Sequence, residues 1–160
     1  MFRHLWMGLA VVLHSACITP EPVAESCEPV HEVAAEGLKA WLDAGCFETW
    51  TSESEVLQAT MSDGHAQVFI NPVLADSLAS SMPEHPVGSA AVRVMYLPDR
   101  ETVWGYALSV KADHVKNGEW FWFEHFEHHD TPTVSGHDAS GCTGCHSGGA
   151  DFVQSTWPLR

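Results

Sequence analysis

The sequence predicts an α+β domain in which a mainly antiparallel β-sheet carries flanking helices. Apolar residues alternate over 90–96 and again over 102–111, which is the period of a β-strand. An Asn-Gly pair at 117–118 then indicates a hairpin turn. The strand that follows, 119–126, is aromatic on both faces, and such a strand is usually covered on both sides. Helical segments are therefore expected against the sheet.

The 160 residues suffice for one domain, which we place at 33–160. Hydrophobic residues make up 45% of the chain, enough for a sizeable core. The formal net charge is −14, with only 7 Lys and Arg, and this disfavours nucleic acid and anionic membrane surfaces as partners. An exported protein, or one that docks to a basic partner, is compatible with this charge.

Residues 1–16 have the pattern of an export signal. Arg3 precedes an apolar run over 5–13, which is too short to span a bilayer as a helix and has the length of a signal-peptide core. The stretch LHSAC also resembles a bacterial lipobox, in which Cys17 would carry lipid, although His14 stands where Leu is usual. We expect export to the periplasm or outer surface. Lipid anchoring stays open, and a buried first helix is the alternative.

Residues 17–32 are rich in Pro and Glu without periodicity and predict a tether. Because an exported chain meets oxidising conditions, loose thiols are not expected. Cys27 and Cys46 would then pair, tying the tether to the first helix, while Cys142 and Cys145 remain as a unit. The alternative is that Cys27 and Cys46 stay unpaired.

The first helix is predicted over roughly 33–44, and Gly45 offers its C-terminal stop. Its apolar residues share one helical face: Leu38, Trp41 and Leu42. Residues 47–64 are ambiguous, with a second short helix around 54–60 as one interpretation. A strand over 65–70 ends at Asn71-Pro72, an N-cap followed by proline at the first helical position.

A helix of about ten residues follows, with Leu74 and Leu78 on one face, and ends by Pro83. In the strand over 90–96, alternation separates the side chains into two sets. Ala90, Val92, Val94 and Tyr96 point one way, and Ala91, Arg93 and Met95 point the other way.

The stretch Cys142-Thr143-Gly144-Cys145-His146 carries the clearest chemical signal. A zinc ribbon would need a second CxxC or a His pair at a defined distance, and no other CxxC exists in the sequence. A thioredoxin-like motif would follow an early strand and open a helix, whereas this one follows a Gly/Ser loop near the C-terminus. The remaining interpretation is covalent haem: two thiols form thioethers, and His146 ligates the iron. A surface disulfide beside a chance histidine is the alternative.

Four stretches carry a family resemblance: GSAAVRVMY, WGYALSVK, EWFWFEHF and CTGCHSGGADFV. In this order they resemble successive blocks of the cytochrome P-460 family, which also includes the cytochromes c′-β, from about residue 65 to the end. The resemblance implies a mostly β fold, often dimeric, with one five-coordinate haem c. His146 would be the proximal ligand in a C-terminal helix or loop. The opposite face of the haem would be open to small ligands such as nitric oxide or hydroxylamine.

One departure from the family concerns Arg93. In the hydroxylamine-oxidising members a lysine at the corresponding place is cross-linked to the haem. Because a guanidinium stays protonated and is a poor nucleophile, the cross-link should be absent here, against hydroxylamine oxidation. Arg93 would instead pair a haem propionate or donate a hydrogen bond to a bound ligand, with a solvent-facing strand arginine as the alternative.

Further candidates surround the haem in this interpretation. By resemblance, Phe69 is a candidate distal cap, with plain core packing as the alternative. The aromatic run Trp120 to Phe123 would wall the haem on one face and fill the core on the other. Candidates for a sixth ligand are Met61, Met82 and Met95, which would otherwise be core residues. The stretch EHFEHHD contains His125, His128 and His129, which would hold a divalent metal or form a hydrated loop.

Two classes of function follow. A five-coordinate iron would bind small diatomic or nitrogen-oxide ligands, with or without turnover. A six-coordinate iron, closed by Met or His, would make the protein an electron carrier for a redox partner.

Overall fold

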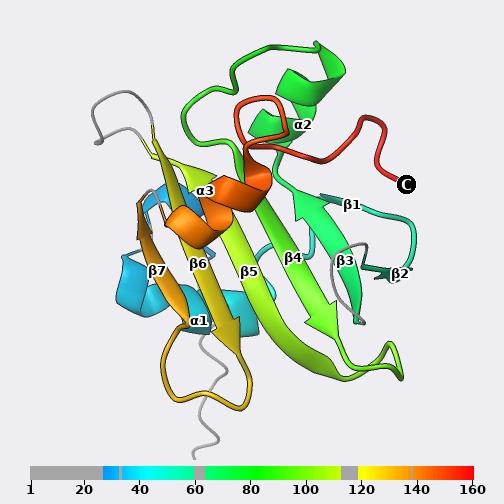
Figure 1. The fold of residues 1–160 in the computed structure, drawn as a ribbon, viewed down its shortest axis with the longest axis vertical. Coiled ribbons are helices and arrows are strands. Elements are labelled where there is room, and N and C mark those ends of the chain that lie inside the picture. The colour runs from blue at the N-terminus through cyan, green and yellow to red at the C-terminus, as the bar shows by residue number, and fades with distance from the viewer. Residues whose placement is uncertain (1–26, 33, 60–63, 113–118, 138) are drawn as a thin grey trace, which may run out of the picture.

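The strands form one antiparallel sheet at the centre of the protein. The computed structural model describes residues 27–32, 34–59, 64–112, 119–137 and 139–160. The strands are β1 (Thr51–Ser52), β2 (Leu57–Gln58), β3 (His65–Ile70), β4 (Ala90–Tyr96), β5 (Val103–Lys111), β6 (Trp120–Phe126) and β7 (Val134–His137). Their order is β1-β3-β4-β5-β6-β7, with β2 also paired to β3, and every pair is antiparallel (Figure 1). The predicted α+β fold is confirmed.

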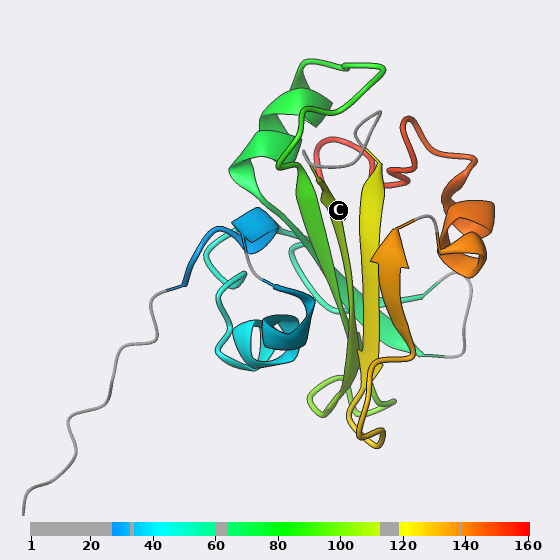
Figure 2. The same cartoon turned by 90° about the vertical axis from the view of Figure 1, so that its left-hand side faces the viewer.

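The helices lie on both sides of this sheet. They are the 3₁₀ turns η1 (Val30–Glu32) and η2 (Ala35–Gly37), and the α-helices α1 (Leu38–Asp43), α2 (Pro72–Ala79) and α3 (Ser140–His146). In Figure 2 the sheet is seen edge-on, with α1 on one side and α3 on the other. We call these two sides the α1 face and the α3 face.

The main hydrophobic core lies on the α1 face. Leu38, Trp41 and Leu42 of α1 pack in one cluster with Val92 of β4 and Leu108 of β5. Each such side chain contributes roughly 1.5–3 kcal/mol by burial, so this face supplies most of the stabilisation. The helical spacing predicted from the sequence is confirmed, and Gly45, at φ +68°, ends the segment in a conformation that favours glycine.

A smaller cluster lies on the α3 face. Ile70 packs there with Leu74 and Ala75 of α2, and Val153 and Leu159 of the C-terminal segment pack against them. The side chain of Asn71 accepts a hydrogen bond from the Leu74 amide, which confirms the predicted N-cap. Both faces of the sheet are therefore covered, as the aromatic pattern of β6 predicts.

The region before α1 is joined to the core by a covalent bond. Cys27 and Cys46 form a disulfide, which confirms the predicted pairing. Val30 is 3% exposed and belongs to the core, so the end of the segment predicted as a tether is packed rather than extended. The export signal and Cys17 lie outside the described residues. Among the described residues, no helix is long and apolar enough to cross a membrane.

Two local predictions have different outcomes. The short helix considered around 54–60 is wrong, because Leu57 and Gln58 form β2 and pair with Ala66 and His65 of β3. The Asn-Gly turn at 117–118 lies outside the described residues.

Candidate functional site

The motif forms helix α3, which stands against the strand β6. The ring of His146 contacts the ring of Trp122 edge-on, with centroids 4.8 Å apart. Trp122 is opposite Ser109 of β5 and Gly136 of β7 in the sheet register. Because side chains alternate along a strand, Trp120, Trp122 and Glu124 share the α3 face. The neighbouring Phe123 lies in the core on the α1 face.

The imidazole of His146 is oriented by a backbone carbonyl. Its Nδ1 lies 2.9 Å from the carbonyl oxygen of Phe152. A carbonyl only accepts, so Nδ1 is the protonated nitrogen that donates. In a neutral imidazole this leaves Nε2 unprotonated, with the lone pair that a metal ligand needs.

The two thiols of the motif are both free. Cys145 is exposed, and Cys142 is half-buried. Burial raises the pKa of the Cys142 thiol, and the nearby Glu124 and Cys145 raise it further. The structure thus presents two unpaired thiols one helical turn apart beside an oriented imidazole.

Helix α3 has little packing of its own. None of its seven residues is buried, and two of them are glycines. Its carbonyls are held from outside the helix, since the Gln154 side chain donates to Cys145 O and the Ser147 hydroxyl to Gly144 O. A helix without an apolar face is held mainly by such contacts or by a bound group.

Two opposite charges, Arg93 and Glu124, lie on the α3 face of the sheet. Arg93 of β4 is opposite Ala107 of β5, which is opposite Glu124 of β6, so the three side chains form one cross-strand row. Burial raises the pKa of Glu124, and the Arg93 guanidinium opposes this rise. Arg93 is half-buried, and its guanidinium acts on the Glu124 carboxylate across one intervening strand.

Glu124 was not predicted as a partner in the site. The available signal was its position: it alternates with two tryptophans on a strand otherwise filled with aromatic residues.

Phe69 does not join this site. It is opposite Val92 in the register, whereas Arg93 is opposite Val68, so Phe69 and Arg93 point to opposite faces of the sheet. The Phe69 ring packs edge-on against Phe47 at 4.9 Å within the main core. Phe69 thus lies in the main core, on the other face of the sheet from Arg93, which agrees with the alternative of core packing.

Histidines of the strands also face away from α3. His65 is opposite Tyr96, His125 opposite Tyr106, and His137 opposite Phe121, all positions on the α1 face. Among strand residues that the structure describes, Met95 is the one His or Met on the α3 face. Met82 is exposed in the loop after α2, and Met61 lies outside the described residues.

The histidines of the EHFEHHD segment are divided between two places. His125 is buried, with its ring stacked on Phe123, whereas His128 and His129 are exposed in the loop after β6. In the described ranges, no group of three or more His, Cys, Asp or Glu is placed to hold a metal ion. The metal-site interpretation of this segment gains no support.

The turn after α3 has a constrained backbone. Asp151 and Phe152 have φ values of +45° and +65°, a region that costs non-glycine residues about 1–3 kcal/mol each. At Gly149 an added Cβ would clash with the backbone carbonyl of Val153. The turn is closed by the hydrogen bond from Val153 N to Ala150 O and by Gly149 N to His146 O.

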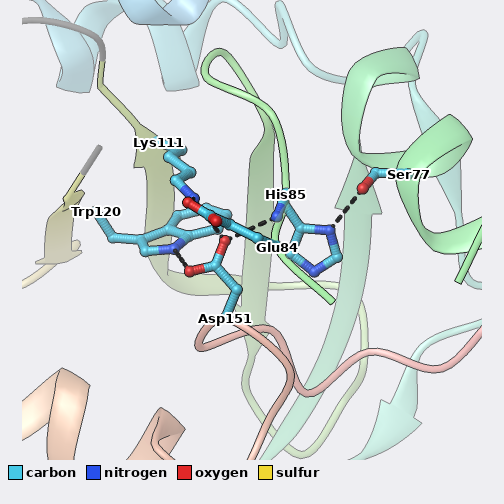
Figure 3. A network of polar contacts seen from close by, with 6 residues as sticks. All are labelled: Ser77, Glu84, His85, Lys111, Trp120 and Asp151. Atoms are coloured by element: carbon cyan, nitrogen blue, oxygen red, sulfur yellow. Dashed lines mark hydrogen bonds and ion pairs between the residues drawn. The ribbon is translucent and has the colours of Figure 1, made fainter. Parts of the chain in front are cut away.

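The Asp151 side chain is the centre of a polar network that the sequence did not reveal (Figure 3). Its carboxylate accepts from Lys111 Nζ at 2.7 Å, from the His85 amide at 2.8 Å and from Trp120 Nε1 at 3.4 Å. Lys111 is 3% exposed and also pairs with Glu84 at 3.2 Å. Behind it, Ser77 is hydrogen-bonded to the ring of His85.

Fold and site together define an α+β protein that carries a thiol–thiol–imidazole motif on one face of an antiparallel sheet. Comparison with protein-family models finds no match to this chain, and comparison with curated proteins finds none either.

Proposed function

We propose that the protein is an exported monohaem c-type cytochrome of the P-460/c′-β type, which binds a small ligand such as nitric oxide. The observation that carries the proposal is the state of the motif: two free thiols followed by a histidine whose Nδ1 donates to the Phe152 carbonyl. This is the tautomer in which Nε2 is available to a metal.

The surrounding residues fit a covalent haem. Cys142 and Cys145 would form the thioethers and His146 would ligate the iron. Within the described part of the chain, the buried Nε1 of Trp122, next to His146, has no hydrogen-bond partner, so a donor is left for a polar group. The sheet face beside it carries the small side chains Ala107 and Ser109. When bound, haem would supply a redox-active iron with a coordination position for a small ligand.

The charged pair would control the polar character of this face. The Arg93 guanidinium stays protonated and donates hydrogen bonds, to a propionate or to the bound ligand. Glu124, whose pKa is raised by burial, would hold or release a proton near the same place. Because arginine stands where a cross-linking lysine is expected from the family resemblance, hydroxylamine oxidation should be weak.

The second candidate function is that of an electron carrier with six-coordinate iron. Met95 decides between this function and ligand binding. Met95 is buried at 8% on the α3 face and would be the sixth ligand from the strands. The small number of such ligands on this face favours the five-coordinate iron. An anchor at Cys17, a basic redox partner and a homodimer are further parts of the proposal.

The test is expression with a cytochrome c maturation system, followed by mass measurement of the denatured chain. We expect one haem bound through Cys142 and Cys145, and its loss in the Cys142→Ala, Cys145→Ala double variant. His146→Ala should change the ferrous spectrum, while the control His128→Ala, an exposed histidine, should not. A wild-type chain that carries no haem would refute the proposal.

The ligand field is tested on the same material. Nitric oxide or carbon monoxide added to the ferrous protein should change the spectrum at once if the iron is five-coordinate. If it responds only in Met95→Leu, the electron-carrier function holds instead.

A further inference from the structure

Asp151 links the turn that follows α3 to two strands of the sheet and to the loop before β4. Its carboxylate is reached by donors from the loop before β4 (His85 N), from β5 (Lys111 Nζ) and from β6 (Trp120 Nε1). Figure 3 shows these groups converging on one side chain. The strongest contact is with Lys111, which is buried and therefore makes an ion pair that water screens little.

Asp151 also affects the position of the carbonyl group that accepts the hydrogen bond from His146. Asp151 precedes Phe152, and both adopt left-handed backbone conformations. Such conformations persist where the surroundings hold them. The side chain of Asp151 provides that hold, because it is bonded to segments far away in sequence. The outcome is a Phe152 carbonyl that points at Nδ1 of His146, 2.9 Å away.

We infer that Asp151 is the positioning residue of the motif: by pinning the Gly149–Val153 turn to Lys111, it sets the tautomer and the ring orientation of His146. The part that concerns iron rests on the proposed function. The part that concerns the tautomer is a property of the chain itself, and it holds with or without haem.

Lys111 pairs with two carboxylates, Glu84 and Asp151, and we expect only Asp151 to affect the turn. Glu84 is 75% exposed and lies 3.2 Å from the same ammonium group, but within the described residues no hydrogen bond joins it to the Gly149–Val153 turn. Glu84→Gln removes one negative charge beside Lys111 and leaves the turn intact. Asp151→Asn removes one charge as well, and releases the turn. The two variants are therefore a matched pair.

The first measurement is nitrogen-15 NMR of the His146 ring in the full chain without haem. The wild type and Glu84→Gln should show the Nδ1–H tautomer. Asp151→Asn should lose it in favour of a mixture of tautomers. Gly149→Ala should give the same loss, because its Cβ displaces the turn while Asp151 stays unchanged. This second variant decides the question if Asp151→Asn does not fold.

The second measurement is the reduction potential of the haem-loaded protein. A histidine that loses its oriented acceptor donates less to iron, which destabilises the ferric state more than the ferrous state. A tenfold change, the lower end for such partners, corresponds to about 59 mV for one electron, so the potential of Asp151→Asn should rise by about that amount. Glu84→Gln should stay closer to the wild type.

Two results would overturn the inference. In the first, Asp151→Asn lowers thermal stability and yet keeps the wild-type tautomer, which is the behaviour of a purely structural ion pair. Alternatively, Glu84→Gln would change the tautomer as much as Asp151→Asn, which would make charge on Lys111 the cause. If the wild type takes up no haem, the proposed function fails, but the NMR comparison still decides the role of Asp151.

Discussion

At the site, the fold disfavours the charged form of Glu124. Burial raises its pKa above the ordinary value of 4.5, and Arg93 in the same cross-strand row opposes that rise. The folded chain therefore holds the Glu124 proton more tightly than the unfolded chain does. By linkage, the stability from this group is complete below about pH 4.5 and is lost as the pH rises through the folded pKa.

Replacing Glu124 by Gln should consequently stabilise the haem-free protein at neutral pH. The gain should shrink as the pH falls toward 4.5, because the wild-type carboxyl is then protonated in both states. Urea unfolding between pH 4 and 8 measures the difference. Arg93→Gln removes the opposing cation and should raise the folded pKa of Glu124 further. The loss of stability with rising pH should then extend to higher pH.

Glu101→Gln is the control, since Glu101 is exposed in the turn between β4 and β5. It should leave the pH dependence of stability unchanged. A Glu124→Gln variant that is less stable than the wild type at every pH would show that the Arg93–Glu124 attraction outweighs the burial of the carboxylate.

Among the α-helices, α3 is the one whose stability depends most on contacts from outside the helix. It has two glycines in seven residues, no buried side chain and no side-chain N-cap hydrogen bond. Without a bound group its helical state rests on the contacts of the following turn. This is the behaviour expected of an element completed by two covalent bonds.

The element-scale prediction uses the two glycines around this turn. At Gly144 an added Cβ would meet no heavy atom of the described structure within 4 Å, so Gly144→Ala should stabilise the helix by up to about 1 kcal/mol. Hydrogen exchange of the haem-free chain should show slower exchange over 140–146. Gly149→Ala should do the reverse, because its Cβ meets the Val153 backbone. Equal exchange in both variants would contradict this account of α3.

Local pattern determined which elements were predictable. The strand over 90–96 has the predicted bounds, and Asn71 caps its helix, because alternation and capping involve neighbours in sequence. The helix considered around 54–60 failed, since β2 exists only through its pairing with β3. No local signal at Leu57 or Gln58 specifies that partner.

At the scale of the whole molecule, the sequence did not reveal which residues from distant segments meet in the folded structure. The alternation of each strand was readable, but which faces of β3 and β4 coincide depends on their register. That register places Phe69 opposite Val92 and thereby removes it from the face of Arg93. Asp151 was missed for a similar reason, because its partners come from three distant segments and none of them forms a motif with it.

The same arrangement limits which amines of the described residues can reach a haem on the α3 face. Lys111 is the described lysine on that face, and it is buried between Glu84 and Asp151. Lys39 pairs with Asp43 and Glu127 and lies over the Tyr106 ring, toward the α1 face. In the described ranges, no lysine on the α3 face has an amine free of carboxylates.

The haem of the loaded protein should therefore carry two thioether bonds and no third link to the chain. Arg93 stays protonated and does not attack the porphyrin edge, while the Lys111 amine is held by its two carboxylates. The ferrous spectrum should lack the long-wavelength Soret band typical of the P-460 proteins, and hydroxylamine turnover should be weak while nitric oxide still binds. Proteolysis and sequencing of the haem peptide test this directly. A third covalent link at Lys111 would mean that its ion pairs with Glu84 and Asp151 open when haem is attached, and Lys111→Met would then abolish both the link and the band.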